Sequence, residues 1–189
     1  MKRIILLILI CLMLGGCAKM GLNKKVLMVI APKNFKDEEY FIPKEIFEDN
    51  GIQVTTTSSN ERATSVYGKD VKVDLLLNDA DTNYDAVVFI GGPGATVYYN
   101  DTKAINLAKS FYREAKVVSA ICLAPVILAN AGLLTGREAT VFTSEASKLT
   151  ARKAIYTGNK VTADGLIITA NGPSAAKEFA NKIVEVLSK

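Results

Sequence analysis

The sequence predicts an α/β fold in which a mainly parallel sheet is covered by helices on both faces. Short apolar, β-branched runs alternate with helix-forming segments along nearly the whole chain, which is the pattern of repeated strand–helix units. Two of these runs, residues 86–90 and 117–120, are apolar enough for strands that are buried on both faces. Gly51 and Gly132 follow two helical segments at the position where helices commonly end.

Local patterns place the elements of the first half. Strands are expected over residues 26–30, 52–57, 71–77 and 86–90, and helices over residues 38–50 and 101–114. Pro43 interrupts the first helical segment, so its first turn is expected to lie nearer to Pro43. Asn100 or Asp101 is the expected N-cap of the second helix, because both side chains can accept hydrogen bonds from free backbone N–H groups.

The second half continues the alternation and ends in a helix. Strands are expected over residues 117–120 and 139–142, a hairpin from Val161 to residues 166–169, and helices over residues 124–131, 145–154 and 174–187. Pro125 lies near the first turn of its helix, where the missing N–H costs little, and Thr143 or Ser144 is the expected cap of the next. The apolar stripe of the last helix consists of Phe179, Ile183 and Leu187.

The N-terminus has the layout of an export signal. A basic start precedes an apolar run over residues 4–14, which is too short to span a bilayer comfortably. The run ends in Leu14-Gly15-Gly16-Cys17, which resembles the lipobox of bacterial lipoproteins. We therefore expect a signal peptide over residues 1–16, a lipidated tether over residues 17–24 and one domain over residues 25–189. The alternative is an uncleaved anchor with an incidental cysteine, and in both cases the domain is held at a membrane outside the cytoplasm.

Composition excludes several kinds of site. The formal net charge is +4, and acidic residues lie among the basic ones, so no nucleic-acid-binding surface is indicated. The chain has three cysteines and no histidine. Cys11 would leave with the signal peptide and Cys17 would carry lipid, so Cys122 has no disulfide partner within the chain. One remaining cysteine without histidine argues against a metal site, and no cofactor is indicated.

Cys122 is the first candidate for chemistry. It lies between the strand at 117–120 and the helix at 124–131, so it is expected at a strand-to-helix bend. Free backbone N–H groups and the helix dipole at a helix start favour the thiolate, the nucleophilic form of cysteine. The alternative is a small buried apolar side chain, the common fate of a free cysteine.

Two further loops are expected beside Cys122, because the ligand crevice of such sheets lies beyond the carboxyl ends of the strands. After Ile90 comes a glycine-rich loop over residues 91–95, in which the N–H of Gly92 could form an oxyanion hole with that of Leu123. The alternative is a plain tight turn. After Ile30, the acidic residues 37–39 would each complement a helix dipole, unless one carboxyl group points at the thiol with a raised pKa.

The domain resembles the ThiJ/PfpI family, the superfamily of the parkinsonism-associated deglycase, over essentially all of residues 25–189. The matching pieces are Glu39 four residues before Pro43, Tyr84-Asp85 through Gly91-Gly92, Ala120-Ile121-Cys122, Asp164-Gly165-Leu166-Ile167-Ile168-Thr169 and Asn171-Gly172-Pro173. The resemblance implies a flavodoxin-like three-layer sandwich and a homodimer. It also implies that Cys122 is the nucleophile, Glu39 the carboxylic acid hydrogen-bonded to it, and Gly92 and Leu123 the backbone oxyanion donors.

The chain departs from the family pattern in having no histidine. Proteolytic members are thought to use a histidine directly after the cysteine, where this chain has Leu123, and other members place one in the region of residues 140–143. Without imidazole no Cys–His dyad can form, so protease activity is not expected. Glu39 remains as the acid–base group beside the thiol.

Three functions stay open. The first is an enzyme in which Cys122 attacks a small carbonyl electrophile and Glu39 moves the proton, as in glyoxalase-like or deglycase-like relatives. The second, ranked just below it, is a non-catalytic redox or stress-response protein oxidised at Cys122. The third is a surface-held binding domain whose pocket is a relic.

Overall fold

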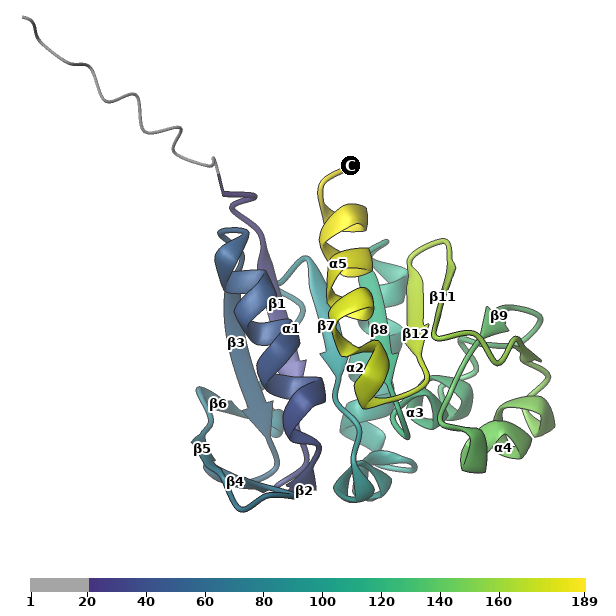
Figure 1. The fold of residues 1–189 in the computed structure, drawn as a ribbon, viewed down its shortest axis with the longest axis horizontal. Helices are drawn as coiled ribbons and strands as arrows, with labels where there is room; N and C mark the ends of the chain where they lie inside the picture. The colour runs from purple at the N-terminus through teal and green to yellow at the C-terminus, as the bar shows by residue number, and fades with distance from the viewer. Residues whose placement is uncertain (1–20) are drawn as a thin grey trace, which may run out of the picture.

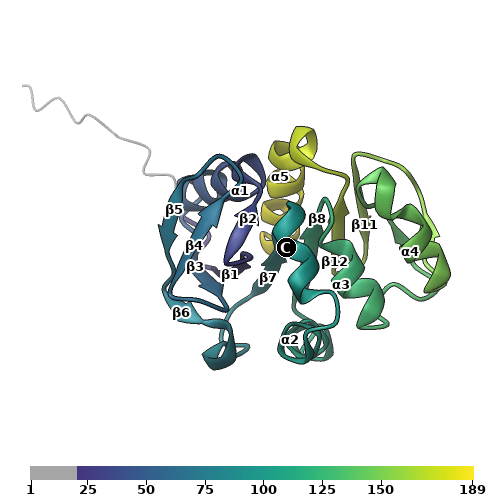
Figure 2. The ribbon, with the colours of Figure 1, turned by 90° about the horizontal axis from the view of Figure 1, so that it is seen from below.

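The computed structural model describes residues 21–189, which form three layers. Helices α1 (Asp37–Asp49) and α5 (Ala176–Leu187) cover one face of the main sheet, and α2 (Thr102–Arg113) and α3 (Pro125–Asn130) cover the other (Figures 1 and 2). The expected signal peptide and the lipidation site at Cys17 lie outside the described residues. Within residues 21–189 no helix is long and apolar enough to cross a bilayer.

The main sheet has seven strands in the order β11-β12-β8-β7-β1-β3-β6. Their bounds are β1 (Lys25–Val29), β3 (Gln53–Ser58), β6 (Leu75–Leu76), β7 (Ala86–Phe89), β8 (Val117–Ile121), β11 (Val161–Asp164) and β12 (Ile167–Ala170). Every neighbouring pair is parallel except β11 and β12, which form the expected antiparallel hairpin. The α/β, mainly parallel, flavodoxin-like fold predicted from the sequence is therefore confirmed.

Two smaller sheets depart from the sequence expectations. β2 (Lys33–Phe35) pairs with β4 (Arg62–Ser65), which pairs with β5 (Asp70–Lys72), and β9 (Glu138–Ala139) pairs with β10 (Ile155–Tyr156). The expected single strand at 71–77 is split between β5 and β6. Asp74 lies at the break, where its N–H donates to the carbonyl of Thr56 at 2.9 Å and its carboxylate accepts from the Thr56 N–H at 2.7 Å.

The helix starts also differ from expectation in two places. α1 begins at Asp37 and runs through Pro43, which cannot donate the hydrogen bond to the carbonyl of Glu39 but does not end the helix. Packing of α1 on α5 and β3 holds the interrupted helix together. The helix expected at 145–154 is the shorter α4 (Ala146–Ala151), and neither Thr143 nor Ser144 caps it. The N-cap predicted for α2 is confirmed, since the Asp101 side chain accepts from the N–H of Ala104 at 2.8 Å.

Four short 3-10 turns connect these elements: η1 (Leu77–Asp79), η2 (Pro93–Tyr98), η3 (Thr143–Glu145) and η4 (Pro173–Ala175). Along the chain, η2 follows β7 and η3 follows β9.

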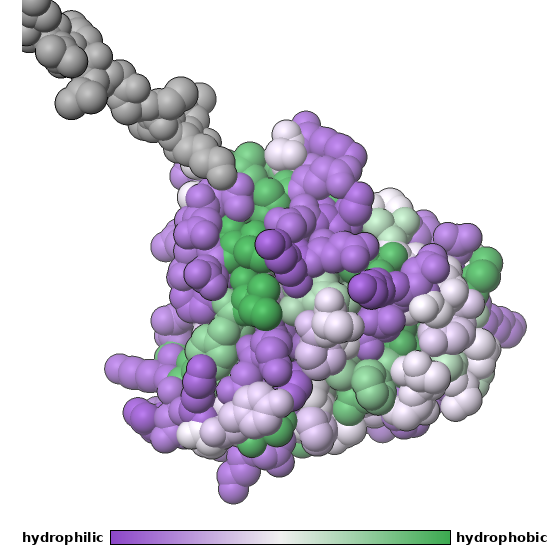
Figure 3. Space-filling view, in the orientation of Figure 1, coloured by the Kyte–Doolittle hydropathy of each residue, from purple (hydrophilic) through white to green (hydrophobic). Residues whose placement is uncertain are grey.

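The core lies between the sheet and its two helical layers. All four residues of β7 and all five of β8 are buried, as expected for central strands of a parallel sheet. The stripe of α5 formed by Phe179, Ile183 and Leu187 is buried as predicted. On the face covered by α1 and α5, hydrophobic residues gather over the junction of the two helices and hydrophilic residues surround them (Figure 3).

Candidate active site around Cys122

Cys122 occupies the turn between β8 and α3, the bend that the sequence predicts. Its φ is +63°, a left-handed conformation that costs a non-glycine residue energy and is held by neighbouring backbone. Its N–H donates to the carbonyl of Ala170 at 2.9 Å, and its carbonyl accepts from the N–H of Phe142 at 2.9 Å. The side chain is 7% exposed, so the thiol lies in a nearly closed space.

Glu39 reaches this space from the first turn of α1. Its side chain is fully buried, and neither carboxyl oxygen has a hydrogen-bond partner among residues 21–189 that meets normal geometry. A Cβ placed on Gly91 would lie 2.6 Å from both the Cβ of Cys122 and the Oε2 of Glu39. The structure therefore brings Glu39 and Cys122 together on either side of Gly91.

The other two acids of the same turn have different surroundings. The Asp37 carboxylate accepts from the Ser65 hydroxyl at 2.7 Å and from the Tyr67 N–H at 3.2 Å, and Glu38 forms an ion pair with Lys36 at 3.3 Å. Asp37 thus holds the turn after β4 and Glu38 pairs with the residue before α1, so only Glu39 of the three lies against the thiol.

The two glycines after β7 permit close approach of the backbone. At Gly91 any side chain would meet the Cβ of Cys122, the Glu39 carboxyl group and the carbonyl of Ile121 at once. At Gly92 the φ is +92°, and a Cβ would lie 2.6 Å from the carbonyl of Asn34. The backbone amides of Gly92 and Leu123 act on the Cys122 sulfur in the direction that favours its thiolate. These are the two amides that the sequence predicts as oxyanion donors.

Burial dominates the electrostatics of the pair. Removal from water raises the pKa of Glu39 to about 8, although the nearby Cys122 thiol and Gly91 amide act in the opposite direction. Removal from water and the negative charge of Glu39 raise the pKa of Cys122 to about 12, against the lowering effect of the Gly92 and Leu123 amides. The expectation that the helix start alone favours a thiolate is therefore too simple, because α3 has only six residues and burial opposes it.

Ionisation of Glu39 raises the pKa of Cys122, so between the pKa of Glu39, about 8, and that of Cys122, about 12, the pair carries a single negative charge. When Glu39 is protonated, its charge no longer opposes the thiolate, and its O–H is free to donate a hydrogen bond to sulfur. This arrangement can hold a proton beside the sulfur and release it over a pH range near neutrality.

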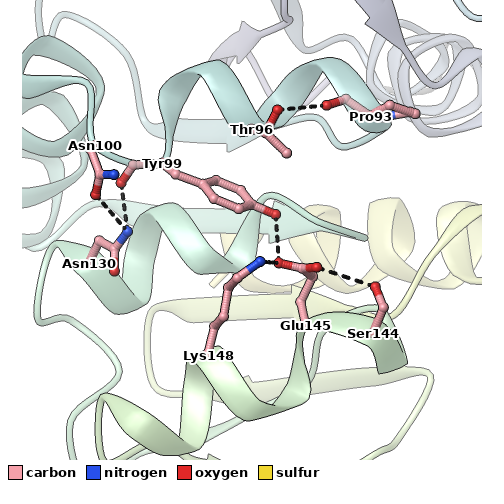
Figure 4. Close-up of polar contacts among 8 residues, drawn as sticks. All are labelled: Pro93, Thr96, Tyr99, Asn100, Asn130, Ser144, Glu145 and Lys148. Atoms are coloured by element: carbon pink, nitrogen blue, oxygen red, sulfur yellow. Dashed lines mark hydrogen bonds and ion pairs between the residues drawn. The ribbon is translucent and has the colours of Figure 1, made fainter.

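A second polar cluster near the thiol was missed by sequence reasoning. The Tyr99 hydroxyl donates to Glu145 Oε2 at 3.1 Å, and Lys148 forms an ion pair with the same oxygen (Figure 4). Asn130 donates to the carbonyl of Tyr99 at 2.7 Å, and Ser144 donates to Glu145 Oε1 at 3.3 Å. No spacing or motif links residues 99 and 145 in the sequence, since the fold alone makes them neighbours.

Among residues 21–189 there is no group of three or more His, Cys, Asp or Glu side chains that could hold a metal ion. A cavity of about 590 Å³ between α1, β3 and β5 contains none of the predicted site residues. The polar groups described near Cys122 are its own thiol, the Glu39 carboxyl group, the Gly92 and Leu123 amides and the Tyr99 phenol.

In comparison with known proteins, residues 24–186 match the sequence model of the DJ-1/PfpI family. The protein MJ0967 of Methanocaldococcus jannaschii is 42% identical over 172 residues, which cover 88% of this chain and 84% of that protein. The crystal structure of a ThiJ/PfpI domain protein from Brachyspira murdochii is 36% identical with a TM-score of 0.85, covering 87% of this chain and 96% of that one. The glutathione-independent glyoxalase DJR-1.2 of Caenorhabditis elegans is 28% identical, covering 89% of this chain and 91% of that protein.

Proposed function

The chain belongs to the DJ-1/PfpI family, and from that premise we propose that it converts small α-oxoaldehydes by nucleophilic attack of Cys122. The observation that carries the proposal is the contact of a nearly buried thiol with a fully buried Glu39 whose pKa is raised to about 8. A group with a pKa near the working pH both accepts and donates protons efficiently. One relative is named a glutathione-independent glyoxalase, which supports this class of substrate.

The reaction begins when the pair loses one proton and the Cys122 sulfur attacks the aldehyde carbon. The carbonyl π electrons move onto oxygen, and the Gly92 and Leu123 amides stabilise the resulting negative charge until the oxygen is protonated. The product is a hemithioacetal. The Glu39 carboxylate then removes the proton from the former aldehyde carbon and returns it to the neighbouring carbon, while the hydroxyl proton passes from the first oxygen to the second. This gives a thioester of a 2-hydroxy acid, which water cleaves to the acid and the free thiol.

One observation favours a second candidate function, the oxidation of Cys122 to a sulfinic acid in a non-catalytic stress-response protein. Neither carboxyl oxygen of Glu39 has a partner of normal geometry among the described residues, so a protonated Glu39 is free to donate to an oxidised sulfur. Oxidation consumes two equivalents of peroxide, each of which delivers one oxygen to sulfur and leaves as water.

The two candidates are separated by one experiment on the wild-type protein and on Cys122→Ser and Glu39→Gln. Incubation with methylglyoxal should yield lactate with the wild type, none with Cys122→Ser, and at least about a hundredfold less with Glu39→Gln, as for loss of a general base. Mass addition of two oxygens at Cys122 by dilute peroxide, without any lactate formation, would favour the redox function. A thiol that reacts with neither methylglyoxal nor peroxide would favour the third hypothesis, a binding domain whose pocket is a relic.

The place of the protein in the cell is a proposal of its own, supported by the sequence of residues 1–17. We propose that Cys17 carries lipid and holds the domain at a membrane outside the cytoplasm. Mass spectrometry of the protein extracted from the membrane fraction should find an N-terminus at Cys17 that carries lipid. An intact N-terminus with unmodified Cys17 would contradict lipidation and favour an uncleaved anchor.

A homodimer is proposed on the family resemblance alone. Sedimentation equilibrium of the purified protein in the micromolar range tests it, with a mass of twice the monomer expected. A monomer mass at every concentration would contradict the homodimer.

A further inference from the structure

The Tyr99–Glu145 hydrogen bond closes a ring of contacts in which Cys122 is one member. One side of the ring runs from Gly92 through η2 to Tyr99, with Ala95 N–H donating to the Gly92 carbonyl at 3.0 Å and Tyr99 N–H to the Thr96 carbonyl at 3.2 Å. The other side runs from Cys122 to Glu145. Phe142 N–H donates to the Cys122 carbonyl at 2.9 Å, and Glu145 N–H donates to the Phe142 carbonyl at 2.8 Å.

The ring fixes the position of the Tyr99 phenol. Its backbone carbonyl is held by Asn130, and Thr96 donates to the Pro93 carbonyl at 2.9 Å within the preceding turn (Figure 4). Its hydroxyl points across to Glu145, which comes from the segment after Phe142. Tyr99 and Lys148 also line an open cavity of about 280 Å³ together with Val126, a residue of α3, on the far side of the phenol from the residues that hold the Cys122 backbone.

Charge keeps the phenol in its donor form. Burial, the Glu145 carboxylate and the charge of Cys122 all raise the pKa of Tyr99, so it stays protonated at every pH at which the site works. Burial would raise the pKa of Glu145, but Lys148, Tyr99 and Ser144 outweigh it and hold the pKa below its usual range. If the Tyr99 O–H turns away from Glu145, the carboxylate keeps Lys148 and Ser144 as partners.

We propose that Tyr99 is a catalytic residue whose O–H turns from Glu145 to donate a hydrogen bond to the second carbonyl oxygen of an α-oxoaldehyde bound to Cys122, and that Glu145 is the positioning residue that holds the phenol in place before substrate binds. The inference rests on the proposed function. It adds that the site recognises a second carbonyl group beside the one that Cys122 attacks.

The chemistry requires such a donor. When Glu39 removes the proton from the former aldehyde carbon, the released electron pair forms a carbon–carbon double bond and pushes charge onto the second carbonyl oxygen. The Gly92 and Leu123 amides are engaged by the first oxygen. A neutral phenol stabilises the second oxygen by hydrogen bonding and keeps its own proton, in the manner of a side-chain oxyanion donor. This chain has no histidine that could donate to the second oxygen, and the phenol supplies that hydrogen bond instead.

The test compares two aldehydes as protectants of Cys122 in the full-length protein. Methylglyoxal has the second carbonyl and propanal lacks it. Each is added at rising concentration, and the initial rate of iodoacetamide alkylation at Cys122 is followed by peptide mass spectrometry. Tyr99→Phe should need about fivefold to tenfold more methylglyoxal for half protection, the loss of one good hydrogen bond, with no change for propanal. Glu145→Gln should shift methylglyoxal protection in the same direction by a smaller factor.

Tyr98→Phe is the matched control. Tyr98 is the neighbouring tyrosine, and its hydroxyl contacts the Ile30 carbonyl at 3.1 Å and the Ser59 N–H at 3.0 Å instead of the Glu145 cluster. Loss of this hydroxyl should lower stability without changing the ratio of methylglyoxal to propanal protection.

Equal weakening for both aldehydes, or no weakening for either, in Tyr99→Phe would overturn the inference, as would a wild type that neither aldehyde protects. Failure of the proposed function gives a different result. In that case methylglyoxal still protects the wild type in a Tyr99-dependent way, but no lactate forms.

Discussion

At the scale of single residues, the shared charge of Glu39 and Cys122 decides the reactivity of the thiol. Above pH 8 Glu39 is ionised in the wild type, and its charge raises the pKa of Cys122. Glu39→Gln removes that charge, so iodoacetamide alkylation of Cys122 at pH 9 should become faster by about tenfold or more. Below pH 8 the difference should shrink, because Glu39 is then protonated in the wild type.

The control for this measurement is Glu45→Gln, an exposed acid on α1 whose loss should leave the pH profile unchanged. A Glu39→Gln variant that reacts more slowly than the wild type at pH 9 would contradict the shared charge.

Glu39 also makes stability depend on pH. Its pKa is about 8 in the folded protein against an ordinary value of 4.5, so the folded state binds a proton that the unfolded state releases between these values. The stabilising effect of the protonated group is complete below pH 4.5 and is lost as pH rises to about 8. Between pH 5 and 8 the free energy of unfolding of Glu39→Gln should rise relative to the wild type by on the order of a few kcal/mol. Urea titrations at both pH values measure the difference, and parallel curves would refute it.

At the scale of elements, the loop after β7 determines whether the site can assemble. Gly91→Ala would place a methyl group 2.6 Å from the Cβ of Cys122, from the Glu39 carboxyl group and from the carbonyl of Ile121. We expect about 1–3 kcal/mol of destabilisation and loss of fast alkylation at Cys122, because the backbone carbonyl cannot move aside as a side chain can.

Gly132→Ala is the matched control for that change. Gly132 has a φ of +75°, but a Cβ there meets no atom within 4 Å, so only backbone strain of about 1 kcal/mol applies. Thermal unfolding of both variants with alkylation rates distinguishes the two effects. Unchanged alkylation in Gly91→Ala would show that the space between Glu39 and Cys122 is larger than the structure indicates.

At the scale of the whole molecule, the segment before β1 ties two parts of the fold together. Leu22 N–H donates to the carbonyl of Asn50 at 2.9 Å, and Lys24 forms an ion pair with Asp85 at 3.4 Å. A protein beginning at Lys25 should therefore be less stable than one beginning at Gly21 by about 1 kcal/mol, measured by urea unfolding. Equal midpoints would mean that residues 21–24 serve only as a tether.

Much of this architecture could be predicted from the sequence. The buried strands at β7 and β8 are continuous apolar runs, the stripe of α5 has helical spacing, and Asp101 is a strong cap residue, so local chemistry suffices for each. The break between β5 and β6 could not be predicted, because it depends on hydrogen bonds between Asp74 and Thr56 from another strand.

For the site too, local sequence predicted one part and contacts between distant segments decided the other. The sequence by itself determined the fold class, the family and the bend at Cys122, because hydrophobic periodicity and short motifs are local properties. Tertiary structure alone decided which of three adjacent acids meets the thiol, how far burial raises the pKa of Glu39, and that Tyr99 and Glu145 become partners. Desolvation and contacts between distant segments depend on how the whole chain packs, and no local pattern records them.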